Sequence, residues 1–506
     1  MATPTFLHRT PELASLDRLT HRTEPSLVLI YGRRRVGKST LARHWAGKTG
    51  WPVFYWESPR STAENVRASL LRELFLWKGE RIVEDRPRAA DWLEVFRTMR
   101  RLIGDQPAVA ILDEFPWAVE ADPGLPSFLK NAWDNVFADT QLKMLIAGSH
   151  ISAMEKLLES DAPLFGRMTG KVLVRPFSFV EIAPYVRRYE LEKRLAVYAI
   201  VGGIPDYLRR WEDRANLMSN IREIFLSDDS PYRNEHMVLI SDVLRRESPD
   251  YQAVLEAVGR GKHDLEAIAS DSQLASGRAA GILNQLTEVR LVERRIRATV
   301  PISQHEQARH AHYHLADPFL RFYYRFVAPN RSRIAQDLGA ALEQQFTEQT
   351  RALVAAEFEA LCRTWTLVQA RHGLLQFAPD FVGSDWGPQH QADVVAVNWR
   401  QHQVFIGEAK WQDDDFDTCT CGKCRCHQQW RQFLERSDHV VTRLKAADPA
   451  RKAKREPAEW ERHLALFTRR SATAAVRSAA KEAGAKLITF AELVKDLEKL
   501  REHPGA

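Results

Sequence analysis

The sequence predicts an α/β protein, with a parallel sheet covered by helices on both faces in its first part and a second, smaller α/β domain in its last part. The runs 27–31, 108–112 and 143–149 have the length and the largely apolar character of buried strands. A segment with helical spacing of its apolar residues, 92–103, lies between the first two runs. From about residue 340, helical and strand patterns alternate again.

The stretch after the first run has the pattern of a phosphate-binding loop, Gly-x-x-x-x-Gly-Lys-Ser, and then turns helical. Its glycines permit backbone angles that other residues resist, so that successive N–H groups point at phosphate oxygens. In this pattern Lys38 contacts the β- and γ-phosphates, and the Ser39 hydroxyl binds Mg²⁺. The sequence therefore predicts a site for ATP and Mg²⁺, formed by Gly32, Arg33, Arg34, Arg35, Val36, Gly37, Lys38, Ser39 and Thr40.

Polar residues at the ends of the next two strands complete this prediction. Asp113 and Glu114 directly follow 108–112, and Ser149 ends 143–149. Because the carboxyl ends of parallel strands meet at one edge of a sheet, these side chains should lie beside the phosphate loop. We expect Asp113 in the Mg²⁺ shell, Glu114 as the base for the attacking water, and Ser149 as a sensor of the γ-phosphate.

Several motifs together resemble the archaeal-type ATPases, an AAA-related P-loop family of archaea and bacteria. They are Arg9-x-x-Glu12-Leu13, the phosphate loop, Ile111-Leu-Asp-Glu-Phe115, Gly148-Ser149, Leu164-Phe-Gly-Arg167 and Tyr198-x-x-x-Gly202-Gly-Ile-Pro-Asp-Tyr-Leu208. The resemblance covers about residues 5–240. It implies an ATPase core over 1–178 and a helical lid over 179–245. It also implies that Arg167 contacts the γ-phosphate, either of its own subunit or of a neighbour in a homo-oligomer.

The middle of the chain, 246–335, predicts a winged helix with a connecting helix. Helical patterns over 251–259, 265–269 and 276–288 precede a strand at 291–296. The third helix has a polar face suited to a major groove, and basic residues follow it in the wing: Arg290, Arg294, Arg295 and Arg297. DNA is therefore the expected partner, although winged helices also serve as protein-binding modules and as rigid linkers.

In the last domain, 340–506, three carboxylates and a lysine form an Asp-x14-Glu-x-Lys arrangement. Asp393 opens a strand, Glu408 and Lys410 share one face of the next strand, and Glu359 lies on a preceding helix. This arrangement looks like the PD-(D/E)xK nuclease superfamily, with a restriction-endonuclease-like fold. The resemblance implies that the carboxylates hold Mg²⁺ and that Lys410 orients the nucleophilic water. Related domains also keep this fold without cleaving.

A cysteine cluster follows within the insertion 413–429. Cys419, Cys421, Cys424 and Cys426 are four thiols in eight residues, which is typical of a metal site. Cys-x-Cys spacing strains a single tetrahedral site, so either His427 replaces one thiolate or two chains share the metal. Zn²⁺ is the first choice, with an iron–sulfur cluster or free thiols as the alternatives.

Composition agrees with a large globular protein. The 506 residues, 44% of them hydrophobic, correspond to about three domains. A net charge of +6 and a pI near 9.0 leave room for basic patches that face nucleic acid. Charged residues interrupt the first twenty positions and no apolar run approaches the length of a membrane span, so we expect a cytoplasmic protein without a membrane partner.

The leading hypothesis is an ATP-hydrolysing protein that acts on DNA through a Mg²⁺-dependent nuclease domain. The main alternative is a nucleotide-dependent switch that binds DNA or protein with an inactive nuclease-like domain. A third hypothesis is a transcriptional regulator that binds DNA through its winged helix.

Overall fold

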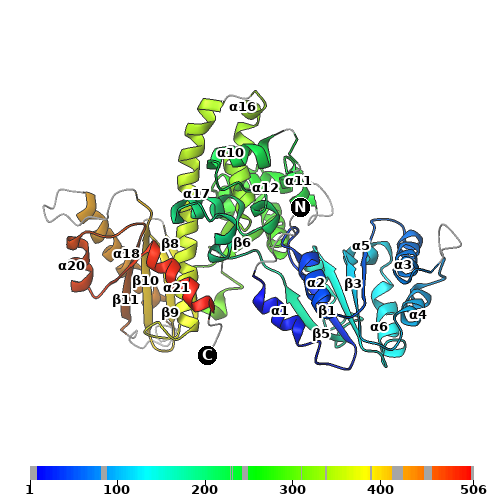
Figure 1. Ribbon diagram of the computed structural model, residues 1–506. Coiled ribbons are helices and arrows are strands. Elements are labelled where there is room, and N and C mark those ends of the chain that lie inside the picture. The colour runs from blue at the N-terminus through cyan, green and yellow to red at the C-terminus, as the bar shows by residue number, and fades with distance from the viewer. Residues whose placement is uncertain are drawn as a thin grey trace. The chain divides into compact units, whose positions relative to one another are not determined.

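The structure is a computed structural model of the chain. It describes residues 8–80, 88–227, 229–230, 232–241, 249–308, 310–336, 339–387, 390–412, 425–448 and 459–502. These residues divide into two compact units, whose helices and strands are drawn in Figure 1. The first unit comprises 8–177, 203–210 and 237–241, and the second comprises 178–202, 211–236 and 249–502, with the gaps just given.

The first unit is built on a five-stranded parallel sheet in the order β2-β3-β4-β1-β5. Its strands are β1 (Ser26–Tyr31), β2 (Val53–Glu57), β3 (Ala108–Asp113), β4 (Leu142–Gly148) and β5 (Met168–Leu173). Since β4 pairs with both β1 and β3, the loops after these three strands open at the same edge of the sheet. The predicted parallel α/β sheet is confirmed.

Helices cover both faces of this sheet. They are α1 (Thr10–Asp17), α2 (Lys38–Lys48), α3 (Ala63–Lys78), α4 (Trp92–Ile103), α5 (Phe115–Ala121), α6 (Leu125–Asn135), α7 (Ile151–Lys156) and α9 (Pro205–Leu208); α11 (Glu235–Ser241) lies at the boundary of the two units. In Figure 1, α1 and α2 lie on one side of the sheet and α3, α4 and α6 on the other. The strands β1, β3 and β4 are therefore buried on both faces, which explains why their sequences are largely apolar.

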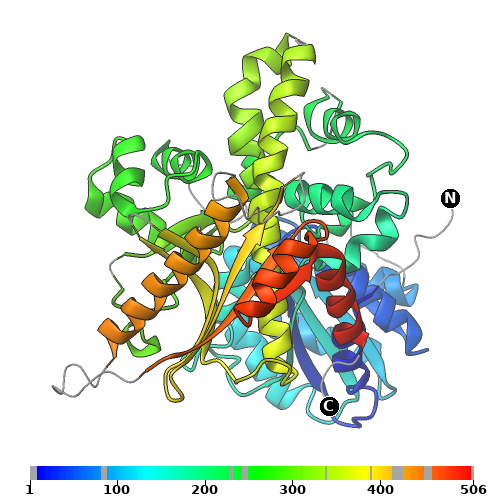
Figure 2. The ribbon, with the colours of Figure 1, turned by 90° about the vertical axis from the view of Figure 1, so that its left-hand side faces the viewer.

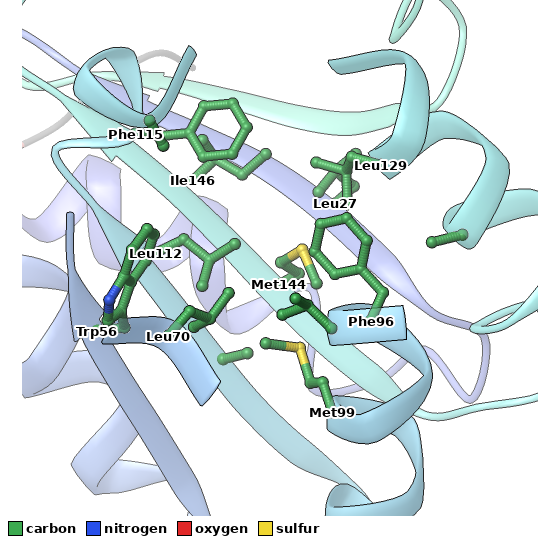
Figure 3. Close-up of a cluster of buried hydrophobic side chains, with 14 of the residues drawn as sticks. Leu27, Trp56, Leu70, Phe96, Met99, Leu112, Phe115, Leu129, Met144 and Ile146 are labelled. Atoms are coloured by element: carbon green, nitrogen blue, oxygen red, sulfur yellow. The ribbon is translucent and has the colours of Figure 1, made fainter. Parts of the chain in front are cut away.

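The core of the first unit lies between the sheet and the helices α3, α4 and α6. Phe96 and Met99 extend from α4 toward Met144 of β4, and Leu70 of α3 lies near Leu112 of β3 (Figure 3). Each such side chain, once buried, contributes about 1.5–3 kcal/mol. This packing fixes the strands whose ends carry the polar residues of the site.

The second unit begins with helices that the sequence assigned to a lid. Its helical elements before the second large sheet are η1 (Phe179–Tyr185), α8 (Leu191–Val201), α10 (Leu217–Ile221), η2 (Arg222–Leu226), α12 (Pro249–Gly259), α13 (Leu265–Asp271), α14 (Ser276–Glu288), η3 (Ile302–Gln304), α15 (Pro318–Phe322), η4 (Tyr323–Val327), η5 (Ala328–Asn330), α16 (Arg331–Ala335) and α17 (Gly339–Arg371). Glu192 of α8 pairs with Arg469, and Phe179 of η1 packs on Phe490 with ring centroids 5.8 Å apart. The first part of the predicted lid thus packs on C-terminal elements.

Three helices, α12, α13 and α14, precede the antiparallel pair β6 (Val292–Arg295) and β7 (His312–Leu315). This is the element order expected of a winged helix, whose role as a DNA-binding module stays a prediction. The chain between the two strands packs on the C-terminal sheet. The Ala298 N–H donates to the Ser384 carbonyl at 3.0 Å, and the Thr299 hydroxyl donates to Asp385 at 2.6 Å. The segment predicted as the wing therefore packs on β8 of the C-terminal sheet through Ala298 and Thr299.

The C-terminal sheet is mixed, with five strands in the order β12-β11-β10-β9-β8. Its elements are β8 (Phe381–Gly387), β9 (His390–Asn398), β10 (Gln403–Lys410), α18 (Arg425–Ala447), β11 (Glu461–Thr468), α20 (Ala474–Glu482), β12 (Lys486–Thr489) and α21 (Phe490–Glu502). The strands β8, β9 and β10 are antiparallel, whereas β10, β11 and β12 are parallel. Figure 2 shows this sheet with α18, in orange, beside it. None of the described helices combines the length and the apolar composition that crossing a bilayer requires.

Candidate functional site

The phosphate loop joins β1 to α2, and its backbone has the geometry that the glycines predicted. Gly37 has φ +92° and precedes the first turn of α2. Gly32 lies so close to the residue after β5 that a Cβ there would be 2.2 Å from the Val174 carbonyl oxygen. Lys38 is buried, and its ammonium donates to the Arg33 carbonyl at 3.3 Å. The loop thus offers a lysine and a helix N-terminus to an anion, which fits the phosphates of ATP.

Arg9, in front of α1, holds this loop from the outside. Its buried guanidinium donates to the Val36 carbonyl at 2.8 Å and to the Arg175 carbonyl at 2.6 Å, and it pairs with Glu12 at 3.1 Å. The guanidinium also lies 4.4 Å from the centroid of the Phe177 ring. These contacts give the Arg9-x-x-Glu12 motif a positioning role for the loop.

Two arginines of the loop contact the short helix α9, which is distant in sequence but belongs to the same unit. Arg35 pairs with Asp206 at 2.9 Å, and Arg33 donates to the Tyr207 hydroxyl at 3.5 Å. Arg35 has φ +67°, a conformation that costs free energy for a residue with a side chain. Its ion pair with Asp206 helps to hold the loop in that conformation.

The carboxylates after β3 lie at the same sheet edge. Asp113 is 2% exposed and accepts a hydrogen bond from the Tyr55 hydroxyl at 2.9 Å. Glu114 accepts hydrogen bonds from the Ser149 hydroxyl at 3.0 and 3.2 Å. The structure therefore brings together the ends of β3 and β4, as the sequence predicted.

The environment of Glu114 suits a group that exchanges a proton. Its backbone has φ +47°, which turns the chain sharply between β3 and α5. Burial raises the pKa of Glu114, the positive charge of Lys38 lowers it, and the negative charge of Asp113 raises it again, with a net upward shift. A carboxyl whose pKa moves toward neutrality is a better base at physiological pH.

Arg167 lies before β5 and is paired within the described structure. Its guanidinium donates to both carboxylate oxygens of Asp134, at 3.2 and 3.1 Å, and 37% of the side chain is exposed. This bidentate pair is a surface contact of small net stability. To contact a γ-phosphate, Arg167 would first have to leave Asp134.

The Glu114→Gln substitution should leave ATP binding intact and lower ATP hydrolysis by about two orders of magnitude. The amide keeps the hydrogen bond to Ser149 but cannot accept a proton. Filter binding of labelled ATP and release of inorganic phosphate measure the two properties separately. Glu120→Gln on α5 is a matched control that should hydrolyse ATP like the wild type. Loss of ATP binding in Glu114→Gln would assign Glu114 a structural or metal-binding role instead.

A second group of charged side chains lies where β9 and β10 run side by side. The Asp393 carboxylate accepts hydrogen bonds from the Ala409 N–H at 2.9 Å and from the Gln391 amide at 3.2 Å. Lys410 pairs with Glu408 at 2.6 Å. The two acidic residues are 7% and 2% exposed. The structure thus brings together the Asp, Glu and Lys of the predicted nuclease signature.

Glu408 has an oxygen atom to spare. Its Oε1 atom contacts both Lys410 and Arg436 of α18, whereas its Oε2 atom is buried and has no hydrogen-bond partner among the residues that the structure describes. An orphaned carboxylate oxygen fits a site for a hard cation such as Mg²⁺. Within the described ranges, however, no three His, Cys, Asp or Glu side chains are grouped closely enough to hold a metal ion. Lys410 and Arg436 supply the positive charge at Glu408.

Glu359 of α17 joins this site through its charge. Burial, followed by the negative charge of Asp393, raises the pKa of Glu359 to about 8. Burial, followed by the charge of Glu408, raises the pKa of Asp393 to about 6. Arg363, one turn after Glu359, donates to the Asp393 backbone carbonyl at 2.9 Å. The carboxyls therefore retain protons that isolated carboxyls lose.

This proton retention predicts that the metal-free protein loses stability as the pH rises from about 4 to about 8. The pKa of Glu359 is higher in the folded state than in the unfolded chain, so the folded state binds more protons in this window and is favoured at its acid end. In Glu359→Gln the fall in Tm between pH 5 and pH 8 should be smaller. Thermal unfolding in EDTA measures it, with the exposed Glu348→Gln as a control that follows the wild type. An unchanged pH dependence in Glu359→Gln would refute the assignment.

The predicted thiolate site lies outside the described residues. Cys419, Cys421 and Cys424 fall within 413–424, and only the backbone of Cys426 is described, in the first turn of α18. The fifth cysteine, Cys362, is buried in α17 and forms no disulfide within the described part of the chain.

The phosphate loop after β1, the carboxylates after β3 and the serine after β4 of a parallel sheet define a P-loop ATPase. Comparison with known proteins agrees: residues 6–210 match the family described as an ATPase domain predominantly from Archaea. Residues 323–421 match a second family, described as archaeal and bacterial proteins of unknown function.

Individual relatives extend over more of the chain. An uncharacterized protein of Methanocaldococcus jannaschii, MJECL04, is 26% identical over 414 residues, which are 81% of this chain and 88% of that protein. Among solved structures, the Walker-type ATPase PABY2304 of Pyrococcus abyssi covers 63% of this chain and 96% of its own, with 20% identity and a TM-score of 0.47. The ORC2 protein of Aeropyrum pernix, in ADPNP–ADP complexes, covers 66% of this chain and 98% of its own, with 14% identity and a TM-score of 0.43.

Several residues of these sites were not predicted from the sequence. Tyr55 contacts Asp113, Asp206 contacts the phosphate loop, and Arg436 contacts Glu408. For Tyr55 a signal was present, because its run 53–56 consists of β-branched and aromatic residues, which is typical of a strand. For Arg436 there was none, since nothing in a helical sequence indicates which residue reaches a strand twenty-eight positions earlier.

Proposed function

We propose that this protein is an ATP-hydrolysing enzyme that acts on DNA and carries a Mg²⁺-dependent nuclease site in its C-terminal sheet. The observation that carries the nuclease proposal is the meeting of Asp393, Glu408 and Lys410 at β9 and β10, where one buried Glu408 oxygen accepts no hydrogen bond from any described residue. The direct test is to measure ATP hydrolysis and Mg²⁺-dependent DNA cleavage, with and without DNA and ATP.

In the ATPase domain, the roles follow from the chemistry of each group. Lys38 neutralises the β- and γ-phosphates, while Ser39 and Asp113 would hold Mg²⁺, which screens the phosphate charge. Glu114 accepts the proton of the attacking water, and Ser149 orients Glu114 through its hydrogen bond. Arg167 would contribute positive charge at the γ-phosphate after releasing Asp134, in its own subunit or in a homo-oligomer.

In the C-terminal domain, Asp393 and Glu408 would hold Mg²⁺, with Glu359 as a further carboxylate nearby. The ion would polarise a scissile phosphodiester and a bound water. Lys410 lies against Glu408 and can hold the water or stabilise charge on the phosphate. The raised pKa values of Glu359 and Asp393 imply that metal binding releases protons and is favoured at higher pH.

Two further assignments belong to this proposal. The polar face of α14, which includes the exposed Asn284 and Gln285, is proposed to bind DNA. Zn²⁺ is assigned to Cys419, Cys421, Cys424 and Cys426, because thiolates favour softer metals than carboxylates do. The zinc would staple the segment after β10, and catalysis would follow Mg²⁺.

The second candidate function is a nucleotide-dependent switch that binds DNA or protein without cutting. The observation that favours it is the contact of both Lys410 and Arg436 with one oxygen of Glu408, because these two cations offset the charge of Glu408 without a metal. The Lys410→Ala substitution separates the two functions. It should abolish cleavage by a nuclease and leave DNA binding by a switch almost unchanged.

A further inference from the structure

A cavity lies within the segment that joins β6 to β7, residues 296–311. It has a volume of about 460 Å³, which is within the range of small-molecule sites. Arg297, Gln304, Gln307 and His310 supply polar groups to its lining, and Ile296 and Val300 supply apolar ones. The cavity belongs neither to the phosphate loop nor to the carboxylates of β9 and β10.

The walls of this cavity are held in place by neighbouring groups. Arg294 donates to the carbonyls of His305 and Ala308, at 3.1 and 2.8 Å, and so holds the later part of the segment, around these two residues. Ala298 and Thr299 attach the early part of the segment to β8 through the hydrogen bonds described above. A site held from both sides loses little conformational entropy when a ligand binds.

Arg297 is the charged group of this cavity. Within the part of the chain that the structure describes, its guanidinium has no hydrogen bond or ion pair, and it lies near Arg443 and Asp385. Asp385 is already engaged by Thr299 and by Arg443, at 2.6 and 3.0 Å. Burial and the nearby Arg443 lower the pKa of Arg297, so a bound anion would offset both penalties.

We propose that this cavity binds the phosphoryl group of a nucleotide, with Arg297 as the charged contact and the amides of Gln304 and Gln307 as further donors. A terminal phosphoryl group carries a charge of about −1.5 to −2, whereas a phosphodiester carries about −1, so the cavity prefers the end of a strand or a free nucleotide. The volume admits one nucleotide.

The position of the cavity relates it to the proposed nuclease site. The version of the proposal in which the ligand is the end of a DNA strand rests on that proposed function. Arg443 and Arg436 are seven residues apart on α18, hence on one face and roughly 10 Å apart. Arg436 contacts Glu408, and Arg443 lies beside Arg297. A distance of roughly 10 Å corresponds to about three nucleotides of a B-form strand. A phosphorylated end in the cavity would thus set where the strand meets the carboxylates.

The test uses the full-length protein with Lys38→Ala, which removes nucleotide binding at the phosphate loop, in EDTA to prevent cleavage. Fluorescence anisotropy measures the binding of one short single-stranded oligonucleotide that carries a phosphate at its 5′ end, at its 3′ end or at neither. Displacement of this oligonucleotide by dAMP measures the binding of a free nucleotide. We expect at least one phosphorylated form to bind about tenfold more tightly than the hydroxyl-ended form. This preference should disappear in Arg297→Gln and persist in Arg400→Gln, an exposed arginine in the turn after β9 and outside the cavity.

Each outcome is decisive for the cavity. Displacement by dAMP that depends on Arg297, without an end preference, supports the phosphoryl site and identifies the free nucleotide as its source. The proposal is overturned if neither the phosphorylated oligonucleotides nor dAMP bind in a way that depends on Arg297, while the Tm of Arg297→Gln equals that of the unsubstituted protein. Failure of the nuclease proposal is seen separately, as absence of Mg²⁺-dependent cleavage by the unsubstituted protein, and leaves the binding comparison intact.

Discussion

The Lys38→Ala substitution is expected to lower ATP turnover by about two to three orders of magnitude. Lys38 is the buried cation of the phosphate loop, and its ammonium lies against the Arg33 carbonyl inside that loop. Alanine would leave the phosphate charge without this partner in a site where little water reaches it. Phosphate release at saturating ATP and equilibrium binding of ATP measure the loss.

A control on the same helix separates a specific effect from damage to the fold. Lys48→Ala removes an exposed lysine in the last turn of α2 and should keep the turnover of the wild type. Thermal unfolding of both variants checks the integrity of the first unit. Turnover of Lys38→Ala within a few-fold of wild type would remove the ATPase mechanism proposed for this loop.

The Asp393→Asn substitution should reduce Mg²⁺-dependent DNA cleavage by on the order of a hundredfold or more. Asparagine has the same shape, and its amide oxygen can still accept the hydrogen bond from the Ala409 N–H. What it loses is the negative charge that would hold Mg²⁺. Cleavage of plasmid and linear DNA at several Mg²⁺ concentrations measures the effect, and a higher Mg²⁺ requirement would point to metal binding.

Two comparisons make this result specific. Asp438→Asn changes an exposed carboxylate of α18 and should cut like the wild type. Elemental analysis should show the same zinc content in Asp393→Asn as in the wild type, because the thiolates are separate ligands. If Asp393→Asn cuts DNA as well as the wild type, the cleavage does not come from this carboxylate site. If neither protein cuts DNA, the binding switch becomes the better account.

The parts of the fold predicted from the sequence are those that local patterns determine. The strands β1, β3 and β4 are largely apolar because both faces are buried, and the glycines of the loop have a local backbone requirement. The strand β5 was not predicted. It pairs only with β1 at the sheet edge, and Thr169, Gly170 and Lys171 interrupt its apolar character.

The side-chain partners of the sites were harder to predict than the sites themselves. The residues in the Arg35–Asp206 pair are 171 positions apart, and those in the Tyr55–Asp113 hydrogen bond are 58 apart. Such contacts depend on how helices and strands pack, which periodicity does not specify. The spacing of Asp393, Glu408 and Lys410 could be predicted because two neighbouring strands with a period of two place them.

The contacts of α9 with the phosphate loop have a consequence for dissecting the chain. The main chain leaves the first unit after Phe177 and returns to it over Gly203–Arg210, where the Gly203 carbonyl accepts a hydrogen bond from the Phe177 N–H at 2.8 Å. An expression fragment that stops at Phe177 would deprive Arg33 and Arg35 of Tyr207 and Asp206. A recombinant ATPase fragment should therefore extend at least to Arg210. Cleavage of the main chain by a protease between residues 178 and 202 should leave the peptide that contains Gly203–Arg210 bound to the first unit.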